Sequence, residues 1–188
     1  MLYNLLIDWE DQTSESGIVE PLTVSEVKNY LRLEGFIDNS ESISSEFNDD
    51  DVLIAELIRS ARERLEEYTG LSFIPKTYEI EFTNLAGNFE IPFGPVSTIN
   101  AVYDNEGNVI SNTTYETSNS LRLFKYPNQT DLVMNYDCGY TDLPKGLKDA
   151  MYKEVAYRYI NRGDENKEGM SREAMVLASK YKTANWLG

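Results

Sequence analysis

The stretch "DDDVLIAELIRSARERLEEYTGLSFIPKTYEIEF" (residues 49–82) contains the change of pattern that decides the fold class. In its first part, apolar residues recur at steps of three or four and place one seam on an α-helix: Ile54, Ile58, Ala61, Leu65 and Tyr68. Gly70 is suited to a left-handed helix end. From Thr77, polar and apolar residues alternate, which is the period of a half-buried strand. The stretch therefore predicts a long helix followed directly by a strand.

The many carboxylates of this helix have ordinary structural explanations. Asp49 to Asp51 lie at its start, where negative charge offsets the positive end of the helix dipole. Arg59 and Glu63, like Arg62 and Glu66, are four residues apart and are expected to pair on the solvent face. We therefore interpret this acidic stretch as a well-capped structural helix rather than as a site for metal binding or proton transfer.

Further elements are predicted on both sides of this stretch. "EPLTVSEVKNYLRL" (residues 20–33) predicts a short helix with Thr23 as the N-cap and Glu26 completing a capping box. Alternation between residues 76 and 138 predicts an antiparallel sheet of about five to seven strands, with one turn at residues 86–88. A long helix is expected at 144–162 and a short one after residue 170.

The order helix, helix, sheet, helix, helix predicts an α+β fold, because strands are grouped rather than alternating with helices. We expect one domain over residues 1–188: a helical bundle with an inserted small antiparallel β region. Its parts are an N-terminal arm (1–20), a helical part (22–70), the β insertion (76–138), the long helix (144–162) and a C-terminal helix with a tail (170–188). The acidic segment 34–48 is interpreted as a solvated loop.

Composition removes most enzyme chemistry from consideration. The chain has no histidine and one cysteine, Cys138, so the common general base, the paired nucleophiles and cysteine-based zinc sites are missing. Carboxylate chemistry remains, and Glu79 and Glu81 share a strand face as a glycosidase pair would require. They are more simply explained as the exposed side of that strand. We predict no catalytic residue, metal or cofactor.

Charge and aromatic content bear on partners. The net charge is −15 and the pI about 4.4, which disfavours tight binding of duplex DNA. No stretch approaches the roughly 20 apolar residues of a membrane span, and the N-terminus lacks the basic flank of a secretory signal, so the cytoplasm is the expected site of synthesis. The 13 tyrosines, with Trp9 and Trp186 near the termini, favour contacts with partner proteins.

Four stretches, in this order, resemble the head–tail connector (adaptor, or head-completion) family of tailed bacteriophages and prophages. They are "EPLTVSEVKNYLRL", the stretch 49–82 quoted above, "IPFGPVSTINAVYDNEGNVI" and "VMNYDCGYTDLPKGLKDAMYKEVAYRYINRGDE". The most specific parts are "EYTG" at the helix end, "PFGPV" before a strand that runs to "YDNEG", and "GYTDLPKGLKDA" before the long helix. Together the four stretches cover more than half of the chain.

The resemblance implies a non-enzymatic virion protein at the head–tail junction, made in a bacterial host. About twelve copies would form a ring beneath the portal protein, extend the DNA channel and bind a tail or stopper protein. DNA would pass through without being held tightly, because like charges repel. In the family the C-terminal segment reaches the portal, which here gives Lys180, Tyr181, Lys182, Trp186 and Leu187 as candidate contacts. Glu41, Glu46 and Asp49 belong to a possible channel or inter-subunit loop.

Two other functions stay open at this point. A carboxylate-based phage glycosidase would need two acids about 5 to 10 Å apart in one cleft. An acidic binding or inhibitor module would bind a basic DNA-processing protein instead of a portal, and its support is the net charge alone.

Overall fold

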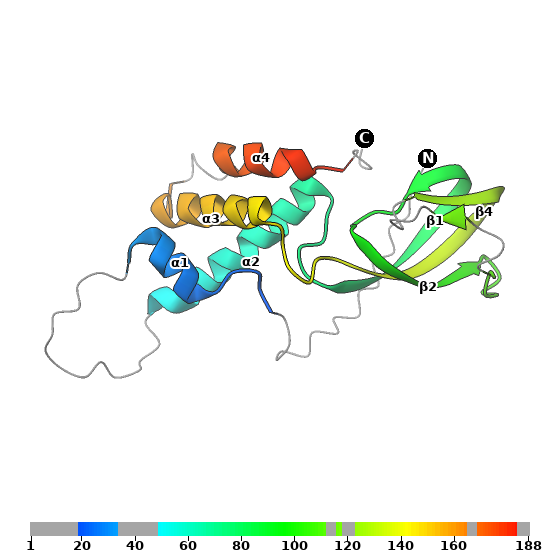
Figure 1. The fold of residues 1–188 in the computed structure, drawn as a ribbon, viewed down its shortest axis with the longest axis horizontal. Coiled ribbons are helices and arrows are strands. Elements are labelled where there is room, and N and C mark those ends of the chain that lie inside the picture. Colours follow the sequence, from blue (N-terminus) through cyan, green and yellow to red (C-terminus); the bar gives the residue numbers. More distant parts are fainter. Residues whose placement is uncertain (1–18, 34–48, 112–115, 118–122, 165–168, 184–188) are drawn as a thin grey trace, which may run out of the picture. The chain divides into compact units, whose positions relative to one another are not determined.

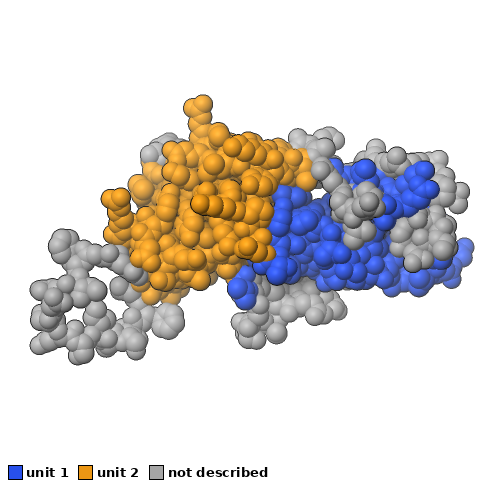
Figure 2. All heavy atoms as spheres, viewed as in Figure 1, with its two compact units in different colours: residues 1–19, 70–141, 185–188 blue, residues 20–69, 142–184 orange. Residues whose placement is uncertain are grey.

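The computed structural model describes residues 19–33, 49–111, 116–117, 123–164 and 169–183. In chain order, two helices are followed by four strands and then by the remaining helices (Figure 1). The fold is α+β, as the sequence predicts. The chain forms two compact units, shown in different colours in Figure 2: residues 20–69 and 142–184, here called the helical unit, and residues 1–19, 70–141 and 185–188, here called the β unit. That they act as one connector domain stays a prediction.

The helical unit is built around α3 (Lys145–Ile160), which contacts α1 (Val24–Leu31), α2 (Asp49–Thr69) and α4 (Arg172–Ala178). A short 3-10 helix, η2 (Ser179–Tyr181), continues α4. Four residues of the predicted α2 seam, Ile54, Ile58, Ala61 and Leu65, are at most 2% exposed, while Tyr68 at its end is half-buried. The buried face of α3 contains Leu147, Ala150, Met151 and Val155. Burying these side chains is the main favourable contribution to the unit.

The predicted ends of the first two helices are confirmed. Thr23 caps α1, with its side chain accepting from the backbone N–H of Glu26, while the Glu26 carboxylate accepts from the N–H of Thr23 at 2.7 Å. Gly70 follows α2 with a φ of 71°, the left-handed conformation expected after a helix. These two signals are local, which is why the sequence alone identifies them.

The β unit contains an antiparallel sheet in the order β1-β4-β2, with β3 also paired to β4. Its long strands are β1 (Lys76–Glu90) and β4 (Leu123–Cys138), and its shorter ones are β2 (Val96–Asp104) and β3 (Glu116–Thr117). The turn predicted at residues 86–88 is wrong: β1 stays paired with β4 from Lys76 to Glu90, and its register shifts twice between Phe82 and Gly87. β-Bulges therefore bend one strand where the sequence predicts a hairpin.

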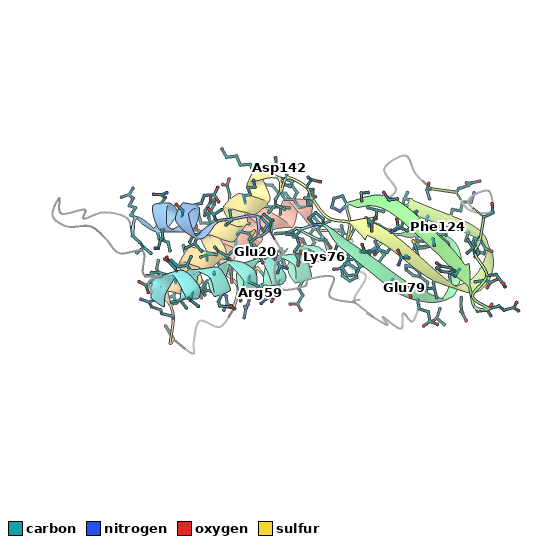
Figure 3. The ribbon with its side chains drawn as sticks, turned by 90° about the horizontal axis from the view of Figure 1, so that it is seen from below. Glu20, Arg59, Lys76, Glu79, Phe124 and Asp142 are labelled. Carbon is teal, nitrogen blue, oxygen red and sulfur yellow. The ribbon has the colours of Figure 1, made fainter. Side chains whose placement is uncertain are left out.

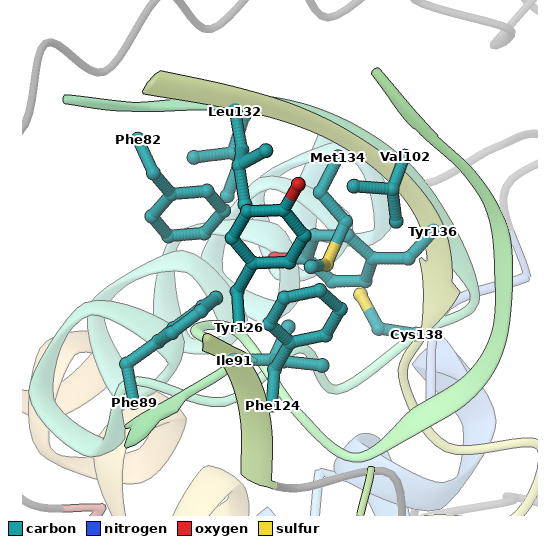
Figure 4. Close-up of a cluster of buried hydrophobic side chains, with 11 residues drawn as sticks. Phe82, Phe89, Ile91, Val102, Phe124, Tyr126, Leu132, Met134, Tyr136 and Cys138 are labelled. Atoms are coloured by element: carbon teal, nitrogen blue, oxygen red, sulfur yellow. The ribbon is translucent and has the colours of Figure 1, made fainter. Parts of the chain in front are cut away.

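The predicted number of five to seven strands is also too high for the described residues, where four are present. The sequence suggests several short strands where the structure has one long strand, β4. This strand pairs with β1 along nearly the whole length of β1. Figure 4 shows aromatic and aliphatic side chains from both halves of β4 meeting in one core. In this core, the ring centroids of Phe89 and Phe124 lie 5.1 Å apart.

The start of the β unit is fixed by close backbone packing. The backbone N–H of Ser72 donates to the carbonyl oxygen of Gly94 at 2.9 Å, and that of Gly139 donates to Pro95 at 2.9 Å. Tyr136 is fully buried, and its hydroxyl donates to the carbonyl oxygen of Pro92 at 2.8 Å. Burial raises the pKa of Tyr136, so this donor stays protonated. Cys138 is also buried.

Candidate assembly surface of the helical unit

The C-terminal segment is packed into the helical unit rather than extending from it. Ser171 caps α4, with its hydroxyl oxygen accepting from the backbone N–H of Ala174 at 3.4 Å. Ala174 and Ala178 are completely buried, since small side chains let α4 approach α3 closely. The first part of the predicted portal-binding segment is therefore also a part of the core of its own unit.

A buried carboxylate fixes the start of this segment. Glu154 of α3 is 0% exposed. One of its oxygens accepts from the backbone N–H of Ser171 at 2.7 Å, and the other from Nε of Arg158 at 2.9 Å. Both oxygens thus have donors, as a buried charge requires. On the surface nearby, Nζ of Lys153 lies 2.8 Å from Oε2 of Glu173, and this ion pair raises the pKa of Lys153, mainly through the hydrogen bond to Glu173.

The end of the segment is held by α2 and by the start of α3. The backbone N–H and the hydroxyl of Thr183 both donate to the carbonyl oxygen of Thr69, at 2.9 and 3.0 Å. Nζ of Lys182 lies 4.8 Å from the centre of the Tyr68 ring, within cation–π range. The Tyr181 ring lies against Gly146, where a Cβ would come within 2.6 Å of the hydroxyl.

These contacts show which of the residues predicted to bind a partner are exposed and which pack within their own unit. Lys180 is exposed, and Lys182 is exposed above Tyr68. Tyr181 is half-buried and packs within its own unit. Trp186 and Leu187 lie outside the described residues, as do Glu41 and Glu46 of the acidic segment. Asp49 is the first residue of α2. Of the named side chains, the structure therefore brings together Lys180, Tyr181 and Lys182, and their role in binding a portal stays a prediction.

One prediction about α2 is wrong in part. Arg59 and Glu63 do pair on the solvent face, with 3.7 Å between the closest side-chain atoms. Arg62 pairs with Glu66 at 2.9 Å as predicted, but it is 3% exposed and therefore buried rather than on the solvent face. Its Nε also donates to Glu20 at 2.8 Å.

Arg62 connects the segment before α1 to α2. Burial by itself would lower the pKa of Arg62, but the hydrogen bond that it donates to Glu20 and the charges of Glu66 and Glu20 raise this pKa above its ordinary value. Glu20 and Arg62 are 42 residues apart in the chain. The spacing of four identifies Glu66 as a partner, whereas no local pattern could identify Glu20. Figure 3 labels Glu20 and Arg59 in this region.

The outer face of the sheet carries a row of hydrogen-bonded polar side chains. Thr77 of β1 donates to Asp137 of β4 at 2.7 Å, and Asn100 of β2 donates to the same carboxylate at 3.0 Å. Asn135 donates to Glu79 at 3.3 Å. The predicted alternation of β1 is confirmed, since Glu79 is exposed while Ile80 and Phe82 are buried. Glu79 thus lies on the exposed side of its strand. This agrees with the simpler interpretation of its sequence position, an exposed strand residue rather than a glycosidase carboxylate.

The described residues contain no group of three or more histidine, cysteine, aspartate or glutamate side chains placed to hold a metal ion. None of the helices in the described part of the chain is long and apolar enough to cross a membrane.

The fold is similar to that of chains in three structures of gene transfer agent (GTA) particles. In the neck of the empty particle, computed with C6 symmetry, the similar chain gives a TM-score of 0.66 at 17% identity, with 100% of this chain and 98% of that one covered. In the virion of the native particle the values are 0.65 and 18%, with the same coverage. In the neck of the native particle, computed with C12 symmetry, they are 0.66 and 17%, again with 100% and 98% covered.

At such identities the likeness establishes a shared fold over the whole chain. No protein-family model and no curated protein matches the sequence.

Proposed function

We propose that this chain is a structural subunit of the neck of a phage or phage-like particle. Copies of it form a ring at the head–tail junction, continue the DNA channel below the portal protein and bind a tail or stopper protein on the other side. The observation that carries the proposal is the likeness over 100% of this chain to chains in neck structures computed with C6 and C12 symmetry. The independent resemblance of four ordered sequence stretches to connector proteins supports it.

The chemistry of the chain suits this role. A neck subunit needs stable surfaces and no reacting group, and the absence of histidine is no loss for it. The net charge of −15 repels the phosphate backbone, so DNA moves through such a ring without being held. The two units give one chain separate surfaces for sister copies and for tail components.

We further propose that the end of the chain contacts the portal. Residues 170–188 carry an excess of basic residues, and the segment ends in Trp186 and Leu187. Since α4 and Thr183 are held within the helical unit, and Lys180 lies in the segment that continues α4, the contact is assigned to Lys182 and the residues that follow Thr183.

The test is co-expression with the portal protein encoded beside it. The purified portal is imaged by electron microscopy, alone and with this chain. We expect an added ring of density below the portal with the chain present. A second preparation uses the chain shortened after Thr183, which keeps every described contact of α4, and here we expect the added ring to be lost. A portal without an added ring, under conditions where both proteins are folded, would overturn the neck assignment; an unchanged ring with the shortened chain would overturn only the portal contact.

A further inference from the structure

The exposed side of α4 presents a short row of basic and apolar side chains. The row consists of Arg172, Glu173, Val176, Ser179 and Lys180. Val176 is 58% exposed at its centre, while Ala174 and Ala178 on the opposite side are buried. Glu173 is already paired with Lys153 of the same chain. The row, here called the α4 row, therefore presents the positive charges of Arg172 and Lys180 on either side of an exposed valine.

The exposed side of α2 presents the opposite charge. Its row consists of Val52, Ala55, Glu56, Arg59, Glu63 and Glu67, here called the α2 row. Val52 is 59% exposed. Arg59 and Glu63 pair with each other, which leaves the negative charges of Glu56 and Glu67. Figure 3 shows α2 along one side of the helical unit, with Arg59 labelled there.

The two rows match in length as well as in charge. At about 1.5 Å per residue in α4 and about 2 Å in η2, where Lys180 lies, Arg172 and Lys180 are about 13 Å apart along the helix axis, and Glu56 and Glu67 about 16 Å. Lysine, arginine and glutamate side chains are long enough to bridge that difference. Each basic residue of the α4 row therefore has an acidic counterpart within reach on the α2 row.

The rows belong to two different helices that both pack against α3. A contact between two different patches is heterologous, and repeating such a contact from copy to copy gives a ring when the rotation between copies closes. An interface that joined α2 to α2 would stop at a dimer and would place acidic side chains against each other.

We propose that the α4 row of one copy docks on the α2 row of the next copy. This proposal rests on the proposed neck function, because it names the surfaces through which the ring subunits meet. Opposite charges set the pairing of the two rows, and Val176, between the two basic residues, supplies apolar contact area.

The test exchanges the charges of one row at a time. The first variant carries Arg172→Glu and Lys180→Glu, and the second carries Glu56→Lys and Glu67→Lys. Neither pair of changes touches the residues that bond Arg62. Matched controls with the same change of net charge carry Lys125→Glu with Lys145→Glu, and Glu106→Lys with Glu116→Lys, all at exposed positions. Assembly is measured by sedimentation velocity for the free chain and by counting copies on the portal in electron micrographs.

Each row variant alone is expected to lose assembly, with at least a tenfold rise in the concentration needed. In an equal mixture the reversed α4 row of one variant faces the reversed α2 row of the other. The mixture should therefore restore assembly to within about threefold of the wild type, and both controls should behave like the wild type. All variants should unfold near the wild-type temperature.

Two failures are distinguishable. If the wild type assembles and both row variants assemble equally well, or if the mixture stays monomeric, the α4–α2 contact is wrong while the ring stands. If the wild-type chain assembles neither free nor on the portal, the neck function itself is overturned, and this contact with it.

Discussion

Single side chains decide how distant parts of each unit are joined. Arg62 ties the segment before α1 to α2 through Glu20, and Glu154 ties α4 to α3 through the backbone of Ser171. In the β unit, Gly139 has a φ of 100° and lies so close to Ile74 that no side chain fits. At each of these positions, the residue type is required by a contact with a residue that is distant in the sequence.

Gly139→Ala tests the close packing in the β unit. A Cβ at this position would overlap the carbonyl oxygen of Ile74, and the backbone has the left-handed conformation that side chains disfavour. We expect a loss of more than about 4 kcal/mol in the free energy of unfolding, or failure of the β unit to fold. The matched control is Gly107→Ala, which has a φ of 82° and no atom within 4 Å of the added Cβ, and should cost about 1 to 2 kcal/mol. Equal losses would contradict the steric explanation.

Glu154→Gln tests the bond that holds α4. An amide offers one accepting oxygen where the carboxylate offers two, so one of the donors, Ser171 N–H or Arg158, loses its partner in a buried place. We expect a loss of about 1 to 3 kcal/mol, measured by urea unfolding. Glu173→Gln, at an exposed ion pair, should cost less than about 1 kcal/mol. A Glu154 variant as stable as the Glu173 variant would show that the buried bonds add nothing.

Helices and strands differ in how far local patterns determine them. The capping box of α1 and the left-handed end of α2 depend on residues within one turn, and the sequence predicts both. The number and course of the strands depend on pairing between residues up to about sixty positions apart. The local sequence around Gly87 is compatible with a turn or with a bulge. The bulge forms because β1 remains paired with β4 on both sides of this position.

The capping box gives α1 a dependence on pH. The backbone N–H and the hydroxyl of Thr23 bond the Glu26 carboxylate and lower its pKa below the ordinary value of 4.5. The contribution to stability is therefore fully present above pH 4.5 and lost as the pH falls through the lowered pKa. Glu26→Gln should be less stable than the wild type at pH 7 by up to about 1 kcal/mol, and this difference should shrink below pH 4.5. A difference that stays constant from pH 7 to pH 3, in chemical unfolding at each pH, would contradict the assignment.

Over the whole molecule, the shared fold with GTA neck chains spans 100% of the sequence, so neither unit is an addition peculiar to this chain. Residues 171–183 stabilise their own helical unit, and we propose that the residues beyond Thr183 contact the portal.

Truncation separates these two roles. Removal of residues 170–188 takes the buried Ala174 and Ala178 out of the core of the helical unit. A chain ending at residue 169 loses α4 and exposes apolar surface of α3, so we expect its unfolding temperature to fall by several degrees or the helical unit to be lost. A chain ending at Thr183 should unfold within about 2 °C of the full chain. Circular dichroism measures both, and equal unfolding temperatures for the two truncations would contradict the structural role of α4.

The sequence by itself determined the fold class, the helices with their local caps, the buried seams and the absence of histidine chemistry, because each depends on residues close together in the chain. The tertiary structure decided which strands are continuous, that Arg62 and Glu154 are buried, and that α4 belongs to the core of the helical unit. These features depend on partners brought together from distant positions. Sequence periodicity records which face of an element is apolar, but it carries no record of which other element covers that face.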